Sequence, residues 1–363
     1  MIKFWEYLQF YNHNKRKILN NFNQTLLSGN LILGDEVKYF EKSFAKYIGV
    51  KYAIAVGNCT DALLIALKVL DLKNKSEVIT VANTAVPTVC SIINANLIPI
   101  FSDINDFYLM DENKLEGLIT KKTKVIMPVH LYGQPCNMKK IISIAKKYNL
   151  KVIEDCAQAT GALHYNKKVG SFGDIGCFSF YPTKVLGGFG DSGMIVTNNE
   201  RLYKKIKNFR FMGIDNEKKS GYAVSTGINS RMDDLQASIL NFKLKNLDFY
   251  IKKRNLIAKF YNDNLDSSKF LLPTIQKNNT HVYYEYVIGA ANRKKIFKQA
   301  KINFVELKIT YPYLIYNMNF FRKYKRKYLP KSEYYSKKIF SLPIYPELNK
   351  SSLKKIVDTL NYI

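Results

Sequence analysis

The sequence predicts an α/β fold built around a mainly parallel sheet and followed by a smaller C-terminal part. From about residue 50 to 200, short apolar runs alternate with segments of helical periodicity. Such alternation implies crossover connections between parallel strands, with helices covering both faces of the sheet. After a long helical stretch the pattern changes to shorter, mixed elements. We therefore expect a large domain over residues 1–245 and a small α+β domain over residues 246–363.

Strands are expected where short apolar runs lie between turn residues. In chain order these are residues 52–56, 78–81, 124–129, 151–154, 177–180 and 194–197, with 282–289 in the C-terminal part. Helices are expected at residues 60–70, 138–148 and 233–264, where apolar side chains recur at helical spacing. Asp233 and Asp234 fall in the first turn of the last helix, where the helix dipole favours carboxylates.

The chain carries a formal net charge of +27, and the excess lies mostly in its second half. Residues 201–363 hold 33 Lys and Arg against 12 Asp and Glu. A nucleic-acid surface, attraction of an anionic lipid or substrate, and a solvated lysine-rich face all explain such a charge. Lys, Asn and Ile are abundant along the whole chain, which favours the solvated face.

Cysteine and histidine usage argues against a disulfide scaffold and against a metal site. The five cysteines are odd in number and show no C-x-x-C spacing, as expected for free thiols in a reducing compartment. The four histidines are scattered. The N-terminus lacks the uninterrupted apolar stretch of a secretory signal, and no apolar run approaches the ~18 residues of a membrane span. We expect a cytoplasmic protein without a membrane span.

Residues 56–61 place Gly57, Asn58, Cys59 and Thr60 between a predicted strand and a predicted helix. The first N–H groups of a helix have no partner within the helix, and the dipole favours an anion there. This predicts a phosphate cradle. Ordinary helix capping by Asn58 or Thr60 explains the same residues.

Asp155 follows the predicted strand at residues 151–154, and Gln158 comes three residues later. In open α/β sheets ligands lie outside the carboxyl ends of the strands. A carboxylate there is able to pair with a protonated ring nitrogen and hold it charged. The alternative is that Asp155 caps the next helix.

Lys184 follows a short apolar strand and Pro182, and a glycine-rich turn comes after it. These surroundings predict a partly enclosed lysine, although most lysines are solvated. Desolvation lowers the pKa of a lysine and makes its neutral amine available for a Schiff base.

Residues 188–193 formally match the G-x-G-x-x-G dinucleotide fingerprint. That fingerprint must follow a strand and open a helix. Here the sequence continues into a strand-like run at residues 194–197, so we reject a nicotinamide or flavin site. Asn229, Ser230 and Arg231 precede the long predicted helix. Either Asn229 or Ser230 caps the helix, or Asn229 or Arg231 points into an anionic site, and the local pattern favours capping.

Taken together, these segments resemble the fold-type-I, pyridoxal-phosphate-dependent sugar aminotransferases of the DegT type, which act on nucleotide-linked keto sugars. The matching segments are Leu33-Gly34, Phe40-Glu41, residues 56–63, Pro128 to Gly133, Ile153 to Ala159, Phe178 to Lys184, Asn229 to Gln236 and Leu342 to Pro346. They occur in the family's order and at its spacing over nearly the whole chain.

The resemblance implies a role for each matching residue. Lys184 would carry pyridoxal 5'-phosphate as a Schiff base and would move protons, Asp155 would pair with the ring nitrogen, and Gln158 with the ring hydroxyl. The phosphate would be held by Asn58, Cys59, Thr60 and Ser179 and, across a subunit boundary, by Asn229. The implied partners are glutamate as amino donor, a nucleoside-diphosphate keto-deoxy sugar as acceptor, and a second copy in a homodimer with shared active sites. Deoxyamino-sugar synthesis for surface polysaccharide is the implied setting.

Two departures and two alternatives remain. The family often has an aromatic residue stacking on the cofactor ring where this chain has Ala85, and Cys59 stands where Gly is common. A cofactor-dependent sugar dehydratase of the same fold is one alternative, but relatives of that type tend to lack the Schiff-base lysine. A basic nucleic-acid-binding regulator is the other, and only the net charge supports it, because no recognition motif is found.

Overall fold

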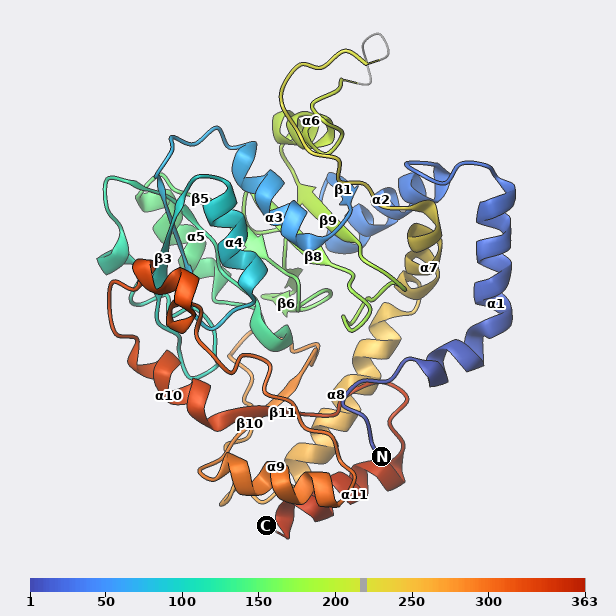
Figure 1. The fold of residues 1–363 in the computed structure, drawn as a ribbon, viewed down its shortest axis with the longest axis vertical. Helices are drawn as coiled ribbons and strands as arrows, with labels where there is room; N and C mark the ends of the chain where they lie inside the picture. Colours follow the sequence, from blue (N-terminus) through green and yellow to red (C-terminus); the bar gives the residue numbers. More distant parts are fainter. Residues whose placement is uncertain (216–220, 363) are drawn as a thin grey trace.

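The computed structural model describes residues 1–215 and 221–362, and a seven-stranded sheet lies at its centre (Figure 1). The strands are β1 (Tyr52–Val56), β2 (Glu77–Val81), β3 (Ile98–Ser102), β4 (Thr123–Ile126), β5 (Lys151–Asp155), β8 (Ile175–Ser179) and β9 (Gly193–Thr197). Their order is β1-β9-β8-β5-β4-β2-β3. Pairing is parallel from β8 through β3, whereas β9 runs antiparallel to both of its neighbours. The predicted α/β class with a mainly parallel sheet is confirmed.

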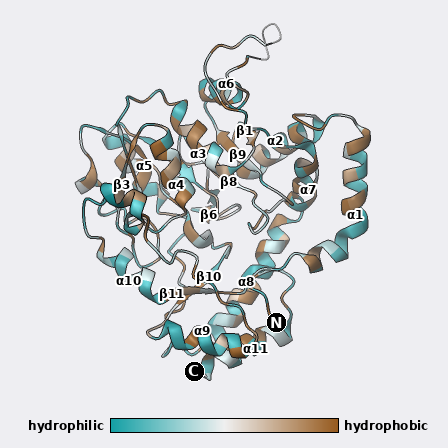
Figure 2. Cartoon of the chain, in the orientation of Figure 1, coloured by the Kyte–Doolittle hydropathy of each residue, from teal (hydrophilic) through white to brown (hydrophobic). Residues whose placement is uncertain are grey.

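Alternating side chains of these strands enter two different cores, which explains the apolar runs in the sequence. In β1, Ala53 and Ala55 pack with Phe44 and other residues of α2 (Asp35–Ile48), whereas Ile54 packs with the residues of α3 (Cys59–Lys68). Both faces of the strand are therefore covered, as a largely parallel sheet requires. Figure 2 shows hydrophobic residues concentrated on these central elements.

Several predicted boundaries differ from the structure. β4 ends at Ile126, short of the predicted residue 129, because Pro128 follows and only an isolated bridge joins Val129 to Asp155. β3 was not predicted. The predicted helix at residues 233–264 is two helices, α7 (Asp234–Leu244) and α8 (Leu247–Asn264), separated at Lys245 and Asn246. The domain boundary at residue 245 stays a prediction.

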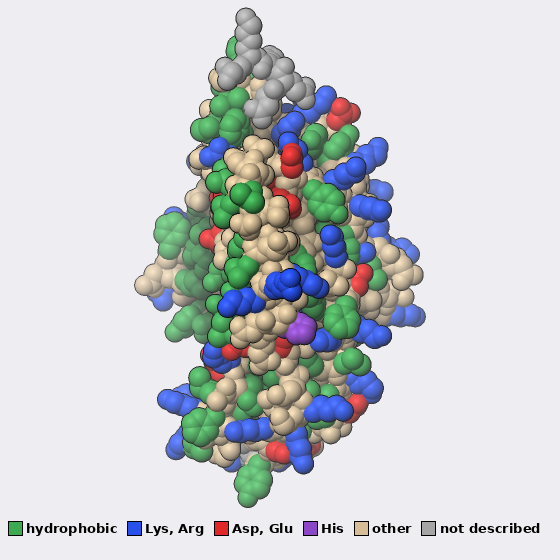
Figure 3. Space-filling model, turned by 90° about the vertical axis from the view of Figure 1, so that its right-hand side faces the viewer, with side chains coloured by type: hydrophobic (Ala, Val, Ile, Leu, Met, Phe, Trp, Pro, Cys, Tyr) green, Lys and Arg blue, Asp and Glu red, His purple; other side chains and the backbone are tan. Residues whose placement is uncertain are grey.

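The remaining helices of residues 1–245 surround the sheet. They are α1 (Leu8–Leu27), α4 (Val86–Asn94), α5 (Met138–Lys147), α6 (Glu200–Phe209) and the 3-10 helices η1 (Glu116–Leu118) and η2 (Leu131–Gly133), with the short strands β6 (Leu163–His164) and β7 (Lys167–Lys168). Helix α1 lies at the edge of the molecule and buries Phe10 and Ile18 near Ile239 of α7. On the face shown in Figure 3, Lys and Arg side chains are spread from top to bottom instead of forming one patch.

In the C-terminal part, helices α8, α9 (Arg293–Ile302) and α11 (Lys350–Asn361) share a core with two antiparallel strands, β10 (Tyr286–Gly289) and β11 (Ile339–Leu342). The other elements between these strands are η3 (Ile315–Asn317), η4 (Asn319–Tyr324) and α10 (Pro330–Lys338), and their buried residues pack with residues of the large sheet instead. β10 begins four residues later than predicted, because Tyr283 has a φ of 47° and interrupts the extended backbone. Among the described helices, none combines the length and the apolar character that crossing a bilayer requires.

Candidate active site

One edge of the sheet collects most of the predicted site residues. β1, β5 and β8 end at this edge, at Val56, Asp155 and Ser179, and the antiparallel β9 begins there at Gly193. Lys184 lies on the chain between β8 and β9. Burial raises the pKa of the Asp155 carboxyl, and the charge of Lys184 opposes that rise, so the two side chains lie on the same side of the sheet edge. Their roles as the Schiff-base lysine and the partner of the ring nitrogen stay predictions.

The start of α3 at this edge has the free donors that a phosphate requires. The side chain of Asn58 caps the helix by accepting a hydrogen bond from the Asp61 N–H at 2.8 Å, so the capping interpretation holds for Asn58. The N–H groups of Cys59 and Thr60 have no hydrogen-bond partner among the described residues. Free amides at a helix N-terminus suit an anion.

Two further residues complete this cradle. The Ser179 hydroxyl accepts a weak bond from the Tyr181 N–H at 3.4 Å, which leaves its own hydrogen free to be donated. At Gly193, a Cβ atom would lie 2.6 Å from the carbonyl carbon of Asn58 and 2.9 Å from the Cys59 nitrogen. Only glycine therefore fits beside the first turn of α3. The donor set and the glycine fit a bound phosphate group.

The Asp155 carboxylate is buried and fixed from two sides. The Thr88 hydroxyl donates to Oδ2 at 2.8 Å, and the Ala157 N–H donates to Oδ1 at 3.1 Å. Burial raises the pKa of Asp155, and the bonds from Thr88 and Ala157 and the charge of Lys184 oppose that rise. Thr88 was missed in the sequence. The one feature of the sequence that draws attention to Thr88 is a second threonine, Thr84, four residues earlier. The Thr84 hydroxyl lies 3.0 Å from that of Thr88.

The side-chain amide of Gln158 is held at both ends. Its Oε1 accepts the Tyr132 N–H at 2.6 Å, and its Nε2 donates to the Tyr311 hydroxyl at 2.6 Å. Tyr311 was not predicted. It lies 153 residues further along the chain, in the C-terminal part.

Lys184 also meets a tyrosine of the C-terminal part. Its Nζ lies 4.3 Å from the centre of the Tyr284 ring, and the Tyr284 hydroxyl lies 3.3 Å from that of Thr183. The glycine-rich turn after Lys184 leads into β9 and opens no helix, which agrees with the rejection of a dinucleotide site.

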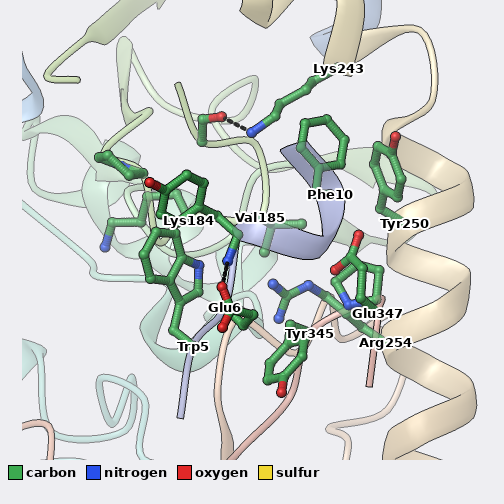
Figure 4. A pocket seen from close by; sticks show the side chains of 14 residues that line it. Trp5, Glu6, Phe10, Lys184, Val185, Lys243, Tyr250, Arg254, Tyr345 and Glu347 are labelled. Carbon is green, nitrogen blue, oxygen red and sulfur yellow. Dashed lines mark hydrogen bonds between the residues drawn. The ribbon is translucent and has the colours of Figure 1, made fainter. Parts of the chain in front are cut away.

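A cavity adjoins Lys184 on the side of the chain's N-terminus (Figure 4). Its walls come from the Trp5–Phe10 region, the turn after Lys184, helix α8 and residues 345–347. Arg254 and Lys243 line it, and burial lowers the pKa of Arg254 to about 10 and that of Lys243 to about 8. The Arg254 Nε has no hydrogen-bond partner among the described residues. Glu6 and Glu347 line the same cavity, so its wall carries both signs of charge and a free Arg254 donor, which suits a strongly polar group of a substrate.

The Asn229 side chain is exposed. The next residue, Ser230, forms hydrogen bonds with the segment before and at the start of α3 in the same chain. Ser230 accepts the Gly57 N–H at 3.0 Å and donates to the Asp61 carboxylate at 2.7 Å. The role of Asn229 at a neighbouring subunit's cofactor stays a prediction. Ala85 is half-buried and precedes α4 as its N-cap residue, so it presents no ring.

His130, Glu154 and Cys156 place metal-ligating atoms within 4.8 Å of one another, but protein groups already engage the first two. His130 Nε2 lies 3.1 Å from the Glu154 carboxylate, and its Nδ1 accepts the Cys136 N–H at 3.0 Å. The same carboxylate also accepts N–H groups of Gly170, Phe172 and Gly173. The cluster is therefore explained as a structural hydrogen-bond network beneath Asp155.

Comparisons with known proteins agree with this geometry. In an alignment of 368 positions that covers 99% of this chain and 98% of the relative, the chain is 38% identical to the dTDP-3-amino-3,4,6-trideoxy-alpha-D-glucose transaminase of Micromonospora megalomicea subsp. nigra. It is 38% identical over 363 residues, 99% of both chains, to the dTDP-3-amino-3,6-dideoxy-alpha-D-galactopyranose transaminase of Aneurinibacillus thermoaerophilus.

Solved structures agree as well. DesV of S. venezuelae, in complex with a ketimine intermediate, superposes with a TM-score of 0.96 at 27% identity and covers 99% of this chain and 98% of its own. NtdA of Bacillus subtilis, with bound cofactor PMP, superposes with a TM-score of 0.90 at 32% identity. The match covers 97% of this chain and 82% of the NtdA chain. The model of the DegT/DnrJ/EryC1/StrS aminotransferase family matches residues 12–361. The chain belongs to the DegT/DnrJ/EryC1/StrS aminotransferase family.

Proposed function

We propose that this protein is a pyridoxal-phosphate-dependent aminotransferase that moves an amino group from glutamate to a nucleotide-linked keto sugar. One observation carries the proposal: a lysine, a buried carboxylate and a helix N-terminus with free amide donors lie at one edge of the sheet. The close relatives named above are transaminases of nucleotide-linked amino sugars, which supports the same substrate class here.

The residues at this edge fit pyridoxal phosphate. The Cys59 and Thr60 amides and the Ser179 hydroxyl would hold its phosphate, and Asp155 would keep a proton on its ring nitrogen. When bound, the cofactor supplies the electron sink that amino transfer needs. Thr88 and Ala157 fix the Asp155 carboxylate, so the carboxylate needs no reorientation to hold that proton.

Lys184 would be the point of covalent attachment and, when released, the group that moves a proton at its Nζ. The glycine-rich turn keeps its backbone in place, because the Gly188 N–H donates to the Phe180 carbonyl at 2.8 Å and Lys243 donates to that of Gly187 at 2.6 Å. We assign the cavity of Figure 4 to a polar part of a substrate, since it lies directly beside this lysine.

We further propose that the amino group is placed on carbon 3 of the sugar. Both transaminases named above carry 3-amino sugars in their names. A third relative, from Pseudomonas aeruginosa, is named as an aminotransferase of a 3-oxo-D-glucuronate and is 35% identical over 95% of this chain and 96% of its own. This agreement supports a 3-keto acceptor for the present chain as well.

A homodimer with shared active sites is the form in which we expect the enzyme to act. Leu31, Ile32, Met212 and Val224 are exposed apolar side chains, and Ile32 lies beside the start of α7, which follows Asn229. A second copy would cover such residues and bring Asn229 to the neighbouring cofactor. Mixing Lys184→Ala subunits with Asn229→Ala subunits should restore activity above that of either variant alone. If sites are not shared, mixing restores nothing.

The function is tested by adding pyridoxal phosphate to the purified protein. We expect a visible absorption band that borohydride removes and that Lys184→Ala lacks. The loaded enzyme is then given glutamate and a panel of nucleotide-linked 3-keto and 4-keto sugars, with mass detection of the amino sugar. A protein that takes up no cofactor contradicts the proposal, and a product formed only from 4-keto sugars contradicts the choice of carbon 3.

A further inference from the structure

The orientation of the Gln158 amide is fixed by two tyrosines. An amide side chain fits its site in two orientations that exchange oxygen and nitrogen, and only its hydrogen-bond partners decide between them. The Tyr132 partner is a backbone N–H, which only donates, so it must face Oε1. The nitrogen therefore faces the Tyr311 hydroxyl. Since Nε2 carries two hydrogens and Tyr311 takes one, a single N–H remains unspent.

The backbone of the turn that carries Tyr132 is strained where it contacts Gln158. Tyr132 has a φ of 59° and the next residue, Gly133, a φ of 107°. An aromatic residue in the left-handed region costs on the order of 1 kcal/mol or more and persists only where its surroundings fix it. Here the hydrogen bond to Gln158 and the burial of the Tyr132 ring provide that fixation.

Tyr311 reaches Gln158 from the C-terminal part of the chain. Its ring packs against that of Tyr132, with centroids 6.1 Å apart, and the hydroxyl of the preceding Thr310 bonds to the buried Glu285 carboxylate. Burial raises the pKa of the Tyr311 hydroxyl well above its ordinary value, so it stays neutral and is able to accept from Nε2. The position of the Gln158 side-chain amide, at the edge of the central sheet, thus depends on a residue of the C-terminal part.

We propose that Tyr311 is a positioning residue that reserves the second N–H of Gln158 for the ring oxygen of pyridoxal phosphate. The inference rests on the proposed function. A donor at that oxygen stabilises its negative charge and weakens its hold on the proton of the nearby Schiff-base nitrogen. Loss of the donor therefore raises the pKa of that nitrogen, which is followed through the pH dependence of the visible band.

The experiment titrates the visible band of the cofactor-loaded wild type, Tyr311→Phe and Tyr286→Phe. Tyr286→Phe is the matched control, because it loses an equally short bond of 2.6 Å, to Asn262, in the C-terminal core. We expect the midpoint to rise by about half a unit to one unit in Tyr311→Phe, as loss of one hydrogen bond predicts, and to be unchanged in Tyr286→Phe. A wild-type midpoint in Tyr311→Phe overturns the inference.

A double-substitution cycle tests whether Tyr311 acts through Gln158. Gln158→Met should raise the midpoint by itself, and adding Tyr311→Phe to it should change nothing further. If Tyr311→Phe shifts the midpoint equally in both backgrounds, Tyr311 acts directly on the bound group and the inference is wrong. If the wild type shows no visible band, the proposed function fails as well, so the two failures are told apart.

Discussion

The sheet edge and the C-terminal part contribute different kinds of groups to the candidate site. Asp155, Lys184 and the α3 cradle come from residues before 245 and carry the charges and free donors. The C-terminal part contributes Arg254 to the neighbouring cavity and two tyrosines, Tyr284 beneath the lysine amine and Tyr311 against Gln158. The groups proposed to react thus lie before residue 245, and the tyrosines that contact them lie after it. Substitutions in each should fail in different ways.

The largest effect is expected for Asp155→Asn. Activity should fall by about 10²–10³-fold, because the fixed charge that we propose to face the cofactor is lost. Burial raises the pKa of Asp155, so its charge costs stability above that pKa and the apoprotein should not melt lower at pH 7. Glutamate-dependent rates and melting curves measure both.

Asp103→Asn is the matched control among the buried carboxylates before residue 245. Asp103 is also buried, but hydrogen bonds from Ser332 overcome the burial and lower its pKa, so its charge stabilises the fold. The free energy of unfolding of this variant should fall by on the order of 1–3 kcal/mol, and the protein loaded with pyridoxal phosphate should keep its visible absorption band. If Asp103→Asn loses the visible band or Asp155→Asn keeps full activity, the assignment of Asp155 to the active site and of Asp103 to the stability of the fold is wrong.

Next in size is Gly193→Ala, which tests the cradle. Its Cβ would press on the backbone of Asn58 at 2.6 Å and displace the amides of Cys59 and Thr60. We expect the dissociation constant for pyridoxal phosphate to rise about 10-fold to 100-fold, from an overpacking cost of ~1–3 kcal/mol. Gly117→Ala, where a Cβ meets nothing within 4 Å, should bind as the wild type does. Equal binding by both variants would remove the cradle from the site.

A smaller effect concerns a buried histidine of the C-terminal part. Burial lowers the pKa of His281 to about 3, while its Nδ1 accepts the Tyr283 N–H at 2.9 Å. The stability it contributes is present above the unfolded pKa of about 6.5 and is lost as pH falls towards 3, by about 1.4 kcal/mol per unit. Urea unfolding between pH 7 and 5 should show this extra slope in the wild type but not in His281→Asn. Parallel pH curves for the two proteins would show that His281 does not cause it.

The smallest effect is expected at Tyr284, and it sharpens the role of the C-terminal part. Replacing the ring beneath the lysine amine by Leu removes a cation–π contact worth about 0.5–1 kcal/mol, so activity should fall about 2-fold to 5-fold. Tyr284→Phe keeps the ring and should retain nearly full activity. A loss as large in Tyr284→Phe as in Tyr284→Leu would move the effect from the ring to the hydroxyl.

Local pattern was enough to predict most of the sheet. Residues 52–56 form β1 as predicted, because both faces of this strand are buried and its apolar run is continuous. The direction of β9 was not predicted, since a strand's direction depends on its neighbours and not on its own residues. The helix at residues 233–264 was predicted as one, because the residues around Lys245 and Asn246 contain neither Gly nor Pro to mark the break.

The candidate site divides in the same way. Asp155, Gln158 and Lys184 stand in contiguous segments whose order resembles the family, and so the sequence alone was enough to propose them. Thr88 lies 67 residues from the carboxylate it contacts, and Tyr311 lies 153 residues from Gln158. The sequence around Thr88 or Tyr311 does not indicate these partners, because only the folded chain brings each residue next to the side chain it contacts.

The antiparallel β9 has a further consequence for the lysine. The segment that carries it leaves the sheet and returns to the same edge, and the Phe180 N–H bonds to the Ser192 carbonyl at 2.9 Å where the two stems meet. The lysine therefore lies on a loop whose two ends are joined by a backbone hydrogen bond. If Lys184 attaches to the cofactor as proposed, the backbone would set its effective molarity at the reacting atom, which should be regained after every turnover without a slow conformational search.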